Sequence, residues 1–192
     1  MNKNANTADV ILDTAQTMVQ ESGFNGFSYA HIADKIGIRT ASIHYHFPSK
    51  EDLGEALIKR YRENFVSFIT QVDAEPRNSL EKLRKFIELY RGGPVDNYRT
   101  CLGVMLSTDL TSLSGKAREG VAQFFTTNLE WLERVLEEGR REGIIRFEGA
   151  ADVQAHQFFA SLQGAQLLAR SFRELRRFDT IAEGLLSALA KE

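Results

Sequence analysis

Only three prolines occur among the 192 residues, and this scarcity limits the possible folds more than any other feature of the chain. Proline removes a backbone donor and interrupts a helix, so a chain that nearly lacks it can pass from one helix to the next. Pro48, Pro76 and Pro94 each fall where a helical spacing of apolar residues stops. No strand-like alternation of useful length appears. The sequence therefore predicts an all-α fold.

Apolar residues recur at helical spacing in nine segments. The first segment ends before Gly23, and the fourth follows Pro48 with Ser49 and Asp52 placed to cap each other's backbone. An irregular loop is expected at residues 92–99. The nine helices are expected at about residues 7–22, 28–37, 40–46, 49–73, 78–90, 100–113, 115–141, 151–172 and 180–190.

Charge and cysteine content limit the class of protein further. With a net charge of −2 and a pI near 6.1, the whole chain does not attract nucleic acid, so DNA binding needs a local basic face. A weak basic face suffices only if dimerisation multiplies its contacts. The single cysteine, Cys101, allows no internal disulfide and suits a reducing cytoplasm. Neither a signal peptide nor an apolar run of about 20 residues is apparent, so no membrane partner is expected.

The stretch from Gly37 to Leu53, GIRTASIHYHFPSKEDL, crowds rings and polar side chains into a short space. Two short helices joined by a turn that contains glycine are typical of a helix-turn-helix. On the second helix Ile43 and Phe47 lie four residues apart and are expected to pack inward, which turns the polar side chains outward. Threonine, serine and histidine reach base edges, whereas tyrosine and lysine favour phosphate oxygens. The stretch therefore predicts a surface that faces DNA.

Two other interpretations of His44, Tyr45 and His46 remain open at this point. The three rings can simply cover a solvated helix face, which is the commoner use of polar residues. His44 and His46 also suggest a metal site, but helical neighbours two residues apart diverge and no third ligand is near in sequence. No metal is therefore expected.

The N-terminal segment resembles the DNA-binding domain of the TetR family of bacterial repressors over about residues 7–57. The resemblance rests on Gly23-Phe24, on Ile32-Ala33 followed by Gly37-Ile38, and above all on YHFPSKEDL at residues 45–53. It implies a homodimer on double-stranded operator DNA, without a cofactor. It also implies a helix-turn-helix domain at residues 1–50, joined by the long fourth helix to a helical effector-binding and dimerisation domain at residues 51–192. The residues that it assigns to DNA are Ser28 and Tyr29 at the backbone, Arg39, Thr40, Ser42 and His44 at bases or nearby phosphates, and Tyr45, His46 and Lys50 at phosphates.

Three positions depart from the usual pattern of that family. Arg39 replaces a common small N-cap residue, Ala41 a frequent glycine, and His44 a frequent tyrosine. These are the positions where an operator preference of this protein's own is expected, with Arg39 suited to guanine.

The resemblance implies that the remaining helices dimerise and enclose an inducer. Small residues at three-four spacing favour close helix approach in a dimer, and leucines add burial; the alternative is that these residues only close the monomer's own core. The small residues are Ala160, Ser161, Gly164 and Ala165, and the leucines are Leu162, Leu167, Leu168, Leu185, Leu186 and Leu189. The expected polar anchors of an effector pocket are Tyr90, Asn128, His156 and Gln163. The expected apolar walls are Leu83, Phe86, Ile87, Met105, Leu106, Leu110, Phe124, Phe125, Leu129, Leu132 and Phe159, which in a filled core are ordinary packing.

Cys101 is a further candidate effector site. If Thr100 caps the following helix, the thiol lies in its first turn beside Arg99, and both the helix end and the guanidinium favour thiolate. The run YRTCLGVMLSTDLTSLS also resembles a TetR subgroup that senses electrophiles and oxidants, with Cys101 and Asp109 in the places of the modified cysteine and an acidic residue. The alternative is a small buried hydrophobe. Without a second cysteine, any switch is an adduct, a sulfenic acid, a mixed disulfide or a bridge between subunits.

The leading hypothesis is a transcriptional repressor that a small-molecule or electrophile inducer releases from its operator. An enzyme is disfavoured because no nucleophile elbow, Walker loop, HExxH or dinucleotide fingerprint appears. A helical small-molecule carrier that does not bind DNA, and a ligand-responsive regulator in which Cys101 plays no redox part, remain the alternatives.

Overall fold

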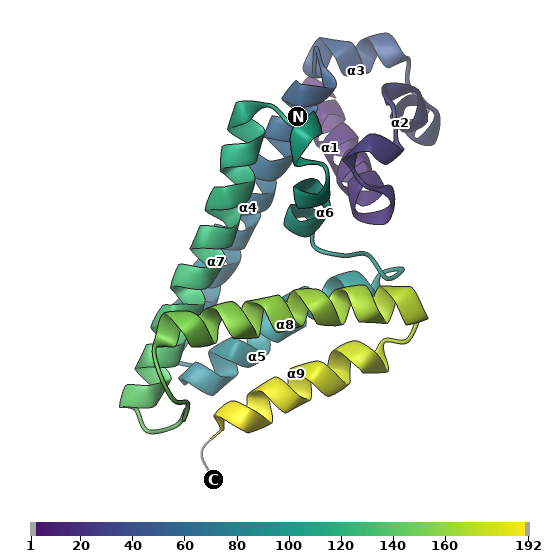
Figure 1. Ribbon diagram of the computed structural model, residues 1–192. Helices are drawn as coiled ribbons and strands as arrows, with labels where there is room; N and C mark the ends of the chain where they lie inside the picture. Colours follow the sequence, from purple (N-terminus) through teal and green to yellow (C-terminus); the bar gives the residue numbers. More distant parts are fainter. Residues whose placement is uncertain (1–2, 191–192) are drawn as a thin grey trace. The chain divides into compact units, whose positions relative to one another are not determined.

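The computed structural model describes residues 3–190, and this part of the chain is helical apart from turns and one isolated antiparallel bridge between Ile145 and Ala190. The predicted all-α class is confirmed. The helices are α1 (Lys3–Ser22), α2 (Tyr29–Ile36), α3 (Thr40–His46), α4 (Lys50–Ala74), α5 (Ser79–Val95), α6 (Leu102–Thr108), α7 (Gly115–Arg141), α8 (Ala151–Phe172) and α9 (Arg176–Leu189), with short 3-10 helices η1 (Phe24–Gly26) and η2 (Leu110–Ser112) (Figure 1).

The expected bounds hold for α3, α7 and α8, and the predicted caps explain two other helix ends. Gly37 ends α2 in the left-handed conformation with φ 69°. Before α4, Ser49 N–H donates to Asp52 Oδ2 at 2.9 Å, and Asp52 N–H donates back to Ser49 Oγ at 3.1 Å. This reciprocal capping satisfies donors that a helix start leaves unpaired.

The end of α5 was predicted wrongly. Pro94 lies inside this helix, which continues to Val95 instead of stopping at Tyr90. Because proline has no N–H, it cannot donate to the Tyr90 carbonyl one turn earlier. The Gln166 side chain supplies the missing donor, with Nε2 at 2.6 Å from Tyr90 O. A side chain 76 residues away thus compensates for a local helix defect.

Three other helix ends also differ from the prediction, and one is the start of α1, which lies at Lys3 instead of about residue 7. The sixth helix is short, and its expected C-terminal half is the separate turn η2, with Asp109 between them. The last helix begins at Arg176, four residues before the expected Thr180. Within the described part of the chain, no helix has the length and apolar content that a membrane crossing requires.

The chain divides into two compact units. Unit 1 holds Met1–Glu63 and Leu102–Phe124, and unit 2 holds Asn64–Cys101 and Phe125–Glu192. In unit 1, α1 packs against α2, α3 and α6. The side chains of Ile11, Ile32, Ile43 and Leu53 are fully buried there, so the short helices α2 and α3 take their stability from this shared core.

Unit 2 packs α8 against both α5 and α9, which lie side by side with it in Figure 1. At its centre Phe86 stacks on Trp131, with ring centroids 5.4 Å apart and planes at 15°. Arg91 and Asp179 join α5 to α9 through two hydrogen bonds of 2.6 and 3.0 Å. This pair holds the pKa of Asp179 below its usual range, because the hydrogen bonds from Arg91 favour the carboxylate.

Candidate DNA interface and effector region

Two buried anchors fix the orientation of α3. Ile43 is fully buried and Phe47 is 8% exposed, as their spacing predicted. The Phe47 N–H donates to Ile43 O at 2.8 Å and closes the helix. Arg39 occupies the N-cap position with an extended backbone. With this side held in the core, the opposite side of α3 is turned to solvent.

The structure brings the predicted DNA residues of α2, α3 and the start of α4 into one region of unit 1. Tyr45 is 76% exposed, the largest exposed fraction among the large apolar and aromatic side chains that protrude. Its ring lies edge-on to His46, with centroids 5.1 Å apart. Ser28, Arg39, Ser42 and His44 are also exposed, Thr40, His46 and Lys50 are half-buried, and Tyr29 is buried.

Tyr29 has an internal role in this structure. Its hydroxyl lies 2.9 Å from Phe47 O and 2.5 Å from Ser49 O, so it donates to the turn between α3 and α4. Burial, and then the charge of Asp52, raises the pKa of Tyr29 to about 12. The hydroxyl therefore remains a proton donor at ordinary pH. Because the side chain is turned inward, a direct contact with a DNA phosphate is not supported for Tyr29.

His44 is oriented by two neighbours. Its Nδ1–H donates to Pro48 O at 3.1 Å, and its ring meets that of Tyr29 with centroids 4.8 Å apart. A carbonyl acceptor at Nδ1 makes Nδ1 the protonated nitrogen of the neutral ring. Nε2 then remains as the acceptor that can face a base.

Lys50 folds inward rather than extending into solvent. Its ammonium donates to Phe27 O at 2.5 Å and lies 4.4 and 4.9 Å from the ring centroids of Phe27 and Phe24. Burial lowers the pKa of Lys50, while the nearby Asp109 carboxylate acts in the opposite direction. To reach a phosphate, the lysine must exchange these contacts for one with DNA.

Asp109 and Asn25 form a polar contact that the sequence did not reveal. Phe24 N–H donates to Asp109 Oδ2 at 2.8 Å, and Asn25 Nδ2 donates to Asp109 Oδ1 at 2.9 Å. The partners are about 85 residues apart in the chain. The local signal is the glycine turn at Gly23, after which the Phe24 and Asn25 N–H groups need an acceptor.

In unit 2 the expected polar anchors have three different environments. Tyr90 donates to Asn128 Oδ1 at 2.6 Å, with both residues buried. The amide atoms of Gln163 are buried and have no hydrogen-bond partner within residues 3–190. A buried amide without a partner is costly, so it marks a place for a ligand or water. His156 is exposed on α8, with Nδ1 bonded to Asp152 O, which removes it from the interior anchors.

Several expected wall residues fill space rather than surround it. Phe86 lies 4.8 Å from Tyr90 and 6.2 Å from Phe159 between ring centroids, and Phe125 lies 6.0 Å from Phe159. Such offset and edge-to-face pairs are normal core packing. Within unit 2 these rings therefore act as core around the polar anchors.

Cys101 is 3% exposed and precedes α6, which begins at Leu102, two residues later than expected. Its backbone N–H donates to Gln166 Oε1 at 2.9 Å. Arg99, the expected neighbour of the thiol, forms an ion pair with Asp96. Gln166 thus holds Cys101 with its oxygen and Tyr90 with its nitrogen, a role that its sequence position alone did not indicate.

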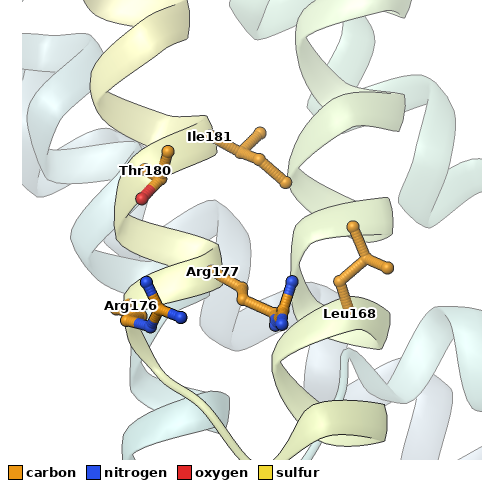
Figure 2. Close-up of a pocket in the computed structure, with 5 residues that line it drawn as sticks. All are labelled: Leu168, Arg176, Arg177, Thr180 and Ile181. Carbon is orange, nitrogen blue, oxygen red and sulfur yellow. The ribbon is translucent and has the colours of Figure 1, made fainter.

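A surface hollow of about 250 Å³ lies between α8 and α9. Figure 2 shows Leu168 on α8 facing Arg176, Arg177, Thr180 and Ile181 on α9. The Arg177 guanidinium also stacks 3.7 Å above the centre of the Phe172 ring. The hollow shares no residue with the buried polar anchors, so it is a separate surface feature of unit 2.

The expected dimer surface divides into residues buried within the protomer and residues that protrude. Leu162, Ala165 and Leu189 are at most 2% exposed, because α5, α8 and α9 pack on one another. The expectation that these three face a second subunit is wrong. In contrast, Leu167 and Leu168 are 44% and 43% exposed, and a Cβ added at Gly164 meets nothing within 4 Å. These residues, with Val153 and Phe172, remain on the surface.

Comparisons with known proteins agree with this organisation. The family model for bacterial regulatory proteins of the tetR family matches residues 11–57, and the model for the tetracyclin repressor-like C-terminal domain matches residues 79–185. A TetR-family transcriptional regulator from Agrobacterium tumefaciens has a crystal structure with a TM-score of 0.92 and 33% identity, over 98% of this chain and 100% of that chain.

Two curated relatives are similar over most of their length. The HTH-type transcriptional repressor NemR of Escherichia coli (strain K12) is 25% identical over an alignment of 189 residues that covers 91% of this chain and 92% of NemR. The nucleoid occlusion factor SlmA of Vibrio vulnificus is 26% identical over 165 residues, 85% of this chain and 83% of SlmA. With family models matching both its N-terminal and C-terminal parts, the chain belongs to the TetR family of bacterial regulatory proteins.

Proposed function

We propose that this protein is a transcriptional repressor that binds operator DNA as a homodimer and leaves it when an inducer binds. The observation that carries the proposal is α3, whose apolar side is locked in the core while Ser42, His44 and Tyr45 are exposed. Such a helix suits the major groove, and a two-fold dimer places two of them about one DNA turn apart. The similarity to the repressor NemR supports this function.

The DNA contacts follow from the exposure of each side chain. Arg39 and His44 suit base edges, with Arg39 matched to guanine. Tyr45 and His46 suit phosphates, as does Lys50 once it leaves Phe27. Because DNA is the target, the cytoplasm is the proposed place of action, and binding rather than catalysis is the proposed activity. We propose residues 1–50 as the DNA-binding domain and residues 51–192 as the effector-binding and dimerisation domain.

We propose the protruding side of α8, together with α9, as the dimer surface. Gly164 and the exposed Ala160 allow close approach of a second helix, and Leu167 supplies apolar area at the same surface. In an isologous interface the same patch meets itself, so one charged residue enters the dimer twice. Leu167→Glu is therefore expected to give monomers in sedimentation and to abolish operator binding.

The proposed inducer site contains Tyr90, Asn128 and Gln163, with Gln163 offering both a donor and an acceptor. We propose Cys101 as a second effector site, at which an electrophile modifies the thiol. At 3% exposure its thiol reacts only during local opening, so modification is expected to be slow. An inducer needs only to favour the released form by about 1–3 kcal/mol to change DNA affinity 5 to 150-fold.

The test is a mobility shift on the DNA upstream of the protein's own gene. Wild type is expected to bind more weakly as salt rises, and Lys50→Ala is expected to lower the slope of log K against log salt by about 2 per dimer, because each protomer loses one phosphate contact. Wild type that is folded but shows no operator binding refutes the function. Equal release of wild type and Cys101→Ser by N-ethylmaleimide refutes only the cysteine route.

A further inference from the structure

The turn between α1 and α2 is tied to the segment that follows α6. Gly23 reverses the chain with φ 83°, and the next two N–H groups point at one carboxylate. Asp109 Oδ2 accepts from Phe24 N–H at 2.8 Å and more weakly from Asn25 N–H at 3.4 Å. Hydrogen bonds to an ionised acceptor are about twice as strong as neutral ones.

The Asn25 side chain extends the same connection. Its Nδ2 donates to Asp109 Oδ1 and to Ser112 Oγ, each at 2.9 Å. A Cβ at Gly23 would lie 3.1 Å from Asp109 Oδ2, so the close approach depends on glycine as well as on its positive φ. Four hydrogen bonds thus connect the turn to Asp109 and Ser112, all within unit 1.

The turn that Asp109 holds also supports Lys50. Phe24, the first residue of η1, and Phe27, which follows η1, supply the two rings against the Lys50 ammonium. The Asp109 carboxylate acts on the charge of the same lysine. The Asp109 carboxylate therefore interacts with two segments: it accepts hydrogen bonds from the turn before α2, and its charge acts on Lys50, the first residue of α4. In the chain, α3 lies between these two segments.

We propose that Asp109 is a positioning residue for DNA binding: it fixes the turn before α2 to the end of α6, and so sets the presentation of α3 and Lys50. The inference rests on the proposed operator binding, and it adds a residue that touches no base or phosphate. Because α6 starts directly after Cys101, this contact also makes the position of α6 matter to the DNA-reading helices.

Simple electrostatics and the positioning role predict opposite changes in operator affinity when Asp109 is removed. Removing an acidic side chain from a DNA-binding unit reduces repulsion by phosphates and strengthens binding. If Asp109 positions the turn, its removal weakens specific binding instead. Glu63→Ala is the matched control, since Glu63 is a 63% exposed carboxylate of unit 1 whose partner Lys59 lies 4.0 Å away.

The experiment measures full-length dimers on the operator duplex and on an unrelated duplex of equal length by fluorescence anisotropy. Asp109→Ala is expected to weaken operator binding about tenfold and to change binding to unrelated DNA less than about twofold. Asp109→Asn keeps an acceptor for Phe24 N–H, so it is expected to retain operator affinity within about threefold of wild type. Glu63→Ala is expected to bind as well as wild type or better.

A charge swap tests the pairing itself. Asn25→Asp places two carboxylates together and is expected to weaken operator binding about tenfold, whereas Asn25→Asp with Asp109→Asn restores it to within about threefold. Asn25→Asp with Glu63→Ala has the same net charge and is expected to restore little. Hydrogen exchange at the Phe24 amide is expected to be faster in Asp109→Ala and to return to the wild-type rate in the Asn25→Asp with Asp109→Asn variant. This rate distinguishes loss of the turn contact from unfolding of the whole protein.

The outcomes separate this inference from the proposed function. Asp109→Ala that binds the operator as tightly as wild type, or more tightly, overturns the inference alone. The same holds if the swap binds no better than the Glu63→Ala control combination. Folded wild type without operator binding overturns the proposed function, and the positioning role falls with it.

Discussion

Replacing Tyr29 by phenylalanine tests how α3 is held, because it removes one hydroxyl and leaves the ring. The hydroxyl contacts Phe47 O and Ser49 O. Ser49 O also accepts the Leu53 N–H at 3.2 Å, so it keeps a partner. Phe47 O loses this donor, and an unsatisfied buried acceptor costs about 1–3 kcal/mol. We therefore expect Tyr29→Phe to lower the free energy of unfolding by about 2 kcal/mol.

For a chain of this length, that loss corresponds to a fall in Tm of about 4–8 °C, measured at one fixed protomer concentration because dimerisation itself stabilises. The pKa of Tyr29 at about 12 keeps the hydroxyl protonated, so the difference is expected to be the same at pH 6 and pH 9. Operator affinity is expected to fall with stability, because the turn between α3 and α4 loosens. An unchanged Tm with reduced operator affinity contradicts this reasoning and restores Tyr29 as a direct DNA contact.

Three further predictions concern the rest of the chain. Tyr45→Ala is expected to change unfolding free energy by less than about 0.5 kcal/mol, because the ring is 76% exposed, while operator affinity measured by anisotropy falls at least several-fold. Asp179→Asn is expected to lower Tm at pH 7. Because the folded pKa of Asp179 is below the usual 3.8, the carboxylate stabilises the fold above that value, and this stabilisation is lost as pH falls through the folded pKa. The Tm values of wild type and variant are therefore expected to converge in acid. Gly139→Ala is expected to cost about 1–3 kcal/mol in denaturant unfolding, because the new Cβ would lie 2.5 Å from Ile145 Cδ1; equal stability of this variant and wild type contradicts the tight packing there.

Local patterns predicted the DNA-reading helices well because their signals lie within a few residues. The Ile43 and Phe47 spacing, the Gly37 stop and the Ser49 cap are all short-range, and the structure has each of them. The family resemblance assigned Tyr29 to DNA, but the assignment carries no information on the direction of a side chain. That direction depends on a turn about 20 residues later in the chain.

Features that depend on distant partners were not predictable in the same way. Pro94 indicates a helix end by local rules, whereas Gln166 compensates for its helical position by donating to the Tyr90 carbonyl. Asp109 carries no local sign that it accepts from Phe24 and Asn25. Small residues occur on α8 both where it packs within the protomer and where it is open. The sequence pattern therefore did not distinguish Ala165, which is buried, from Gly164, where an added Cβ meets nothing within 4 Å.

The pairing of Pro94 with Gln166 has a consequence for how this sequence can change over time. Alanine at position 94 restores a backbone donor to the Tyr90 carbonyl, so the hydrogen bond from Gln166 Nε2 is no longer needed there. Glutamate at position 166 has no such donor and leaves the Tyr90 carbonyl uncompensated while proline remains at position 94. The two positions are therefore expected to covary among relatives, with proline retained only where a side-chain amide or another donor faces it. A change at position 166 made before one at position 94 also disturbs the support of Cys101, so the order of substitutions matters.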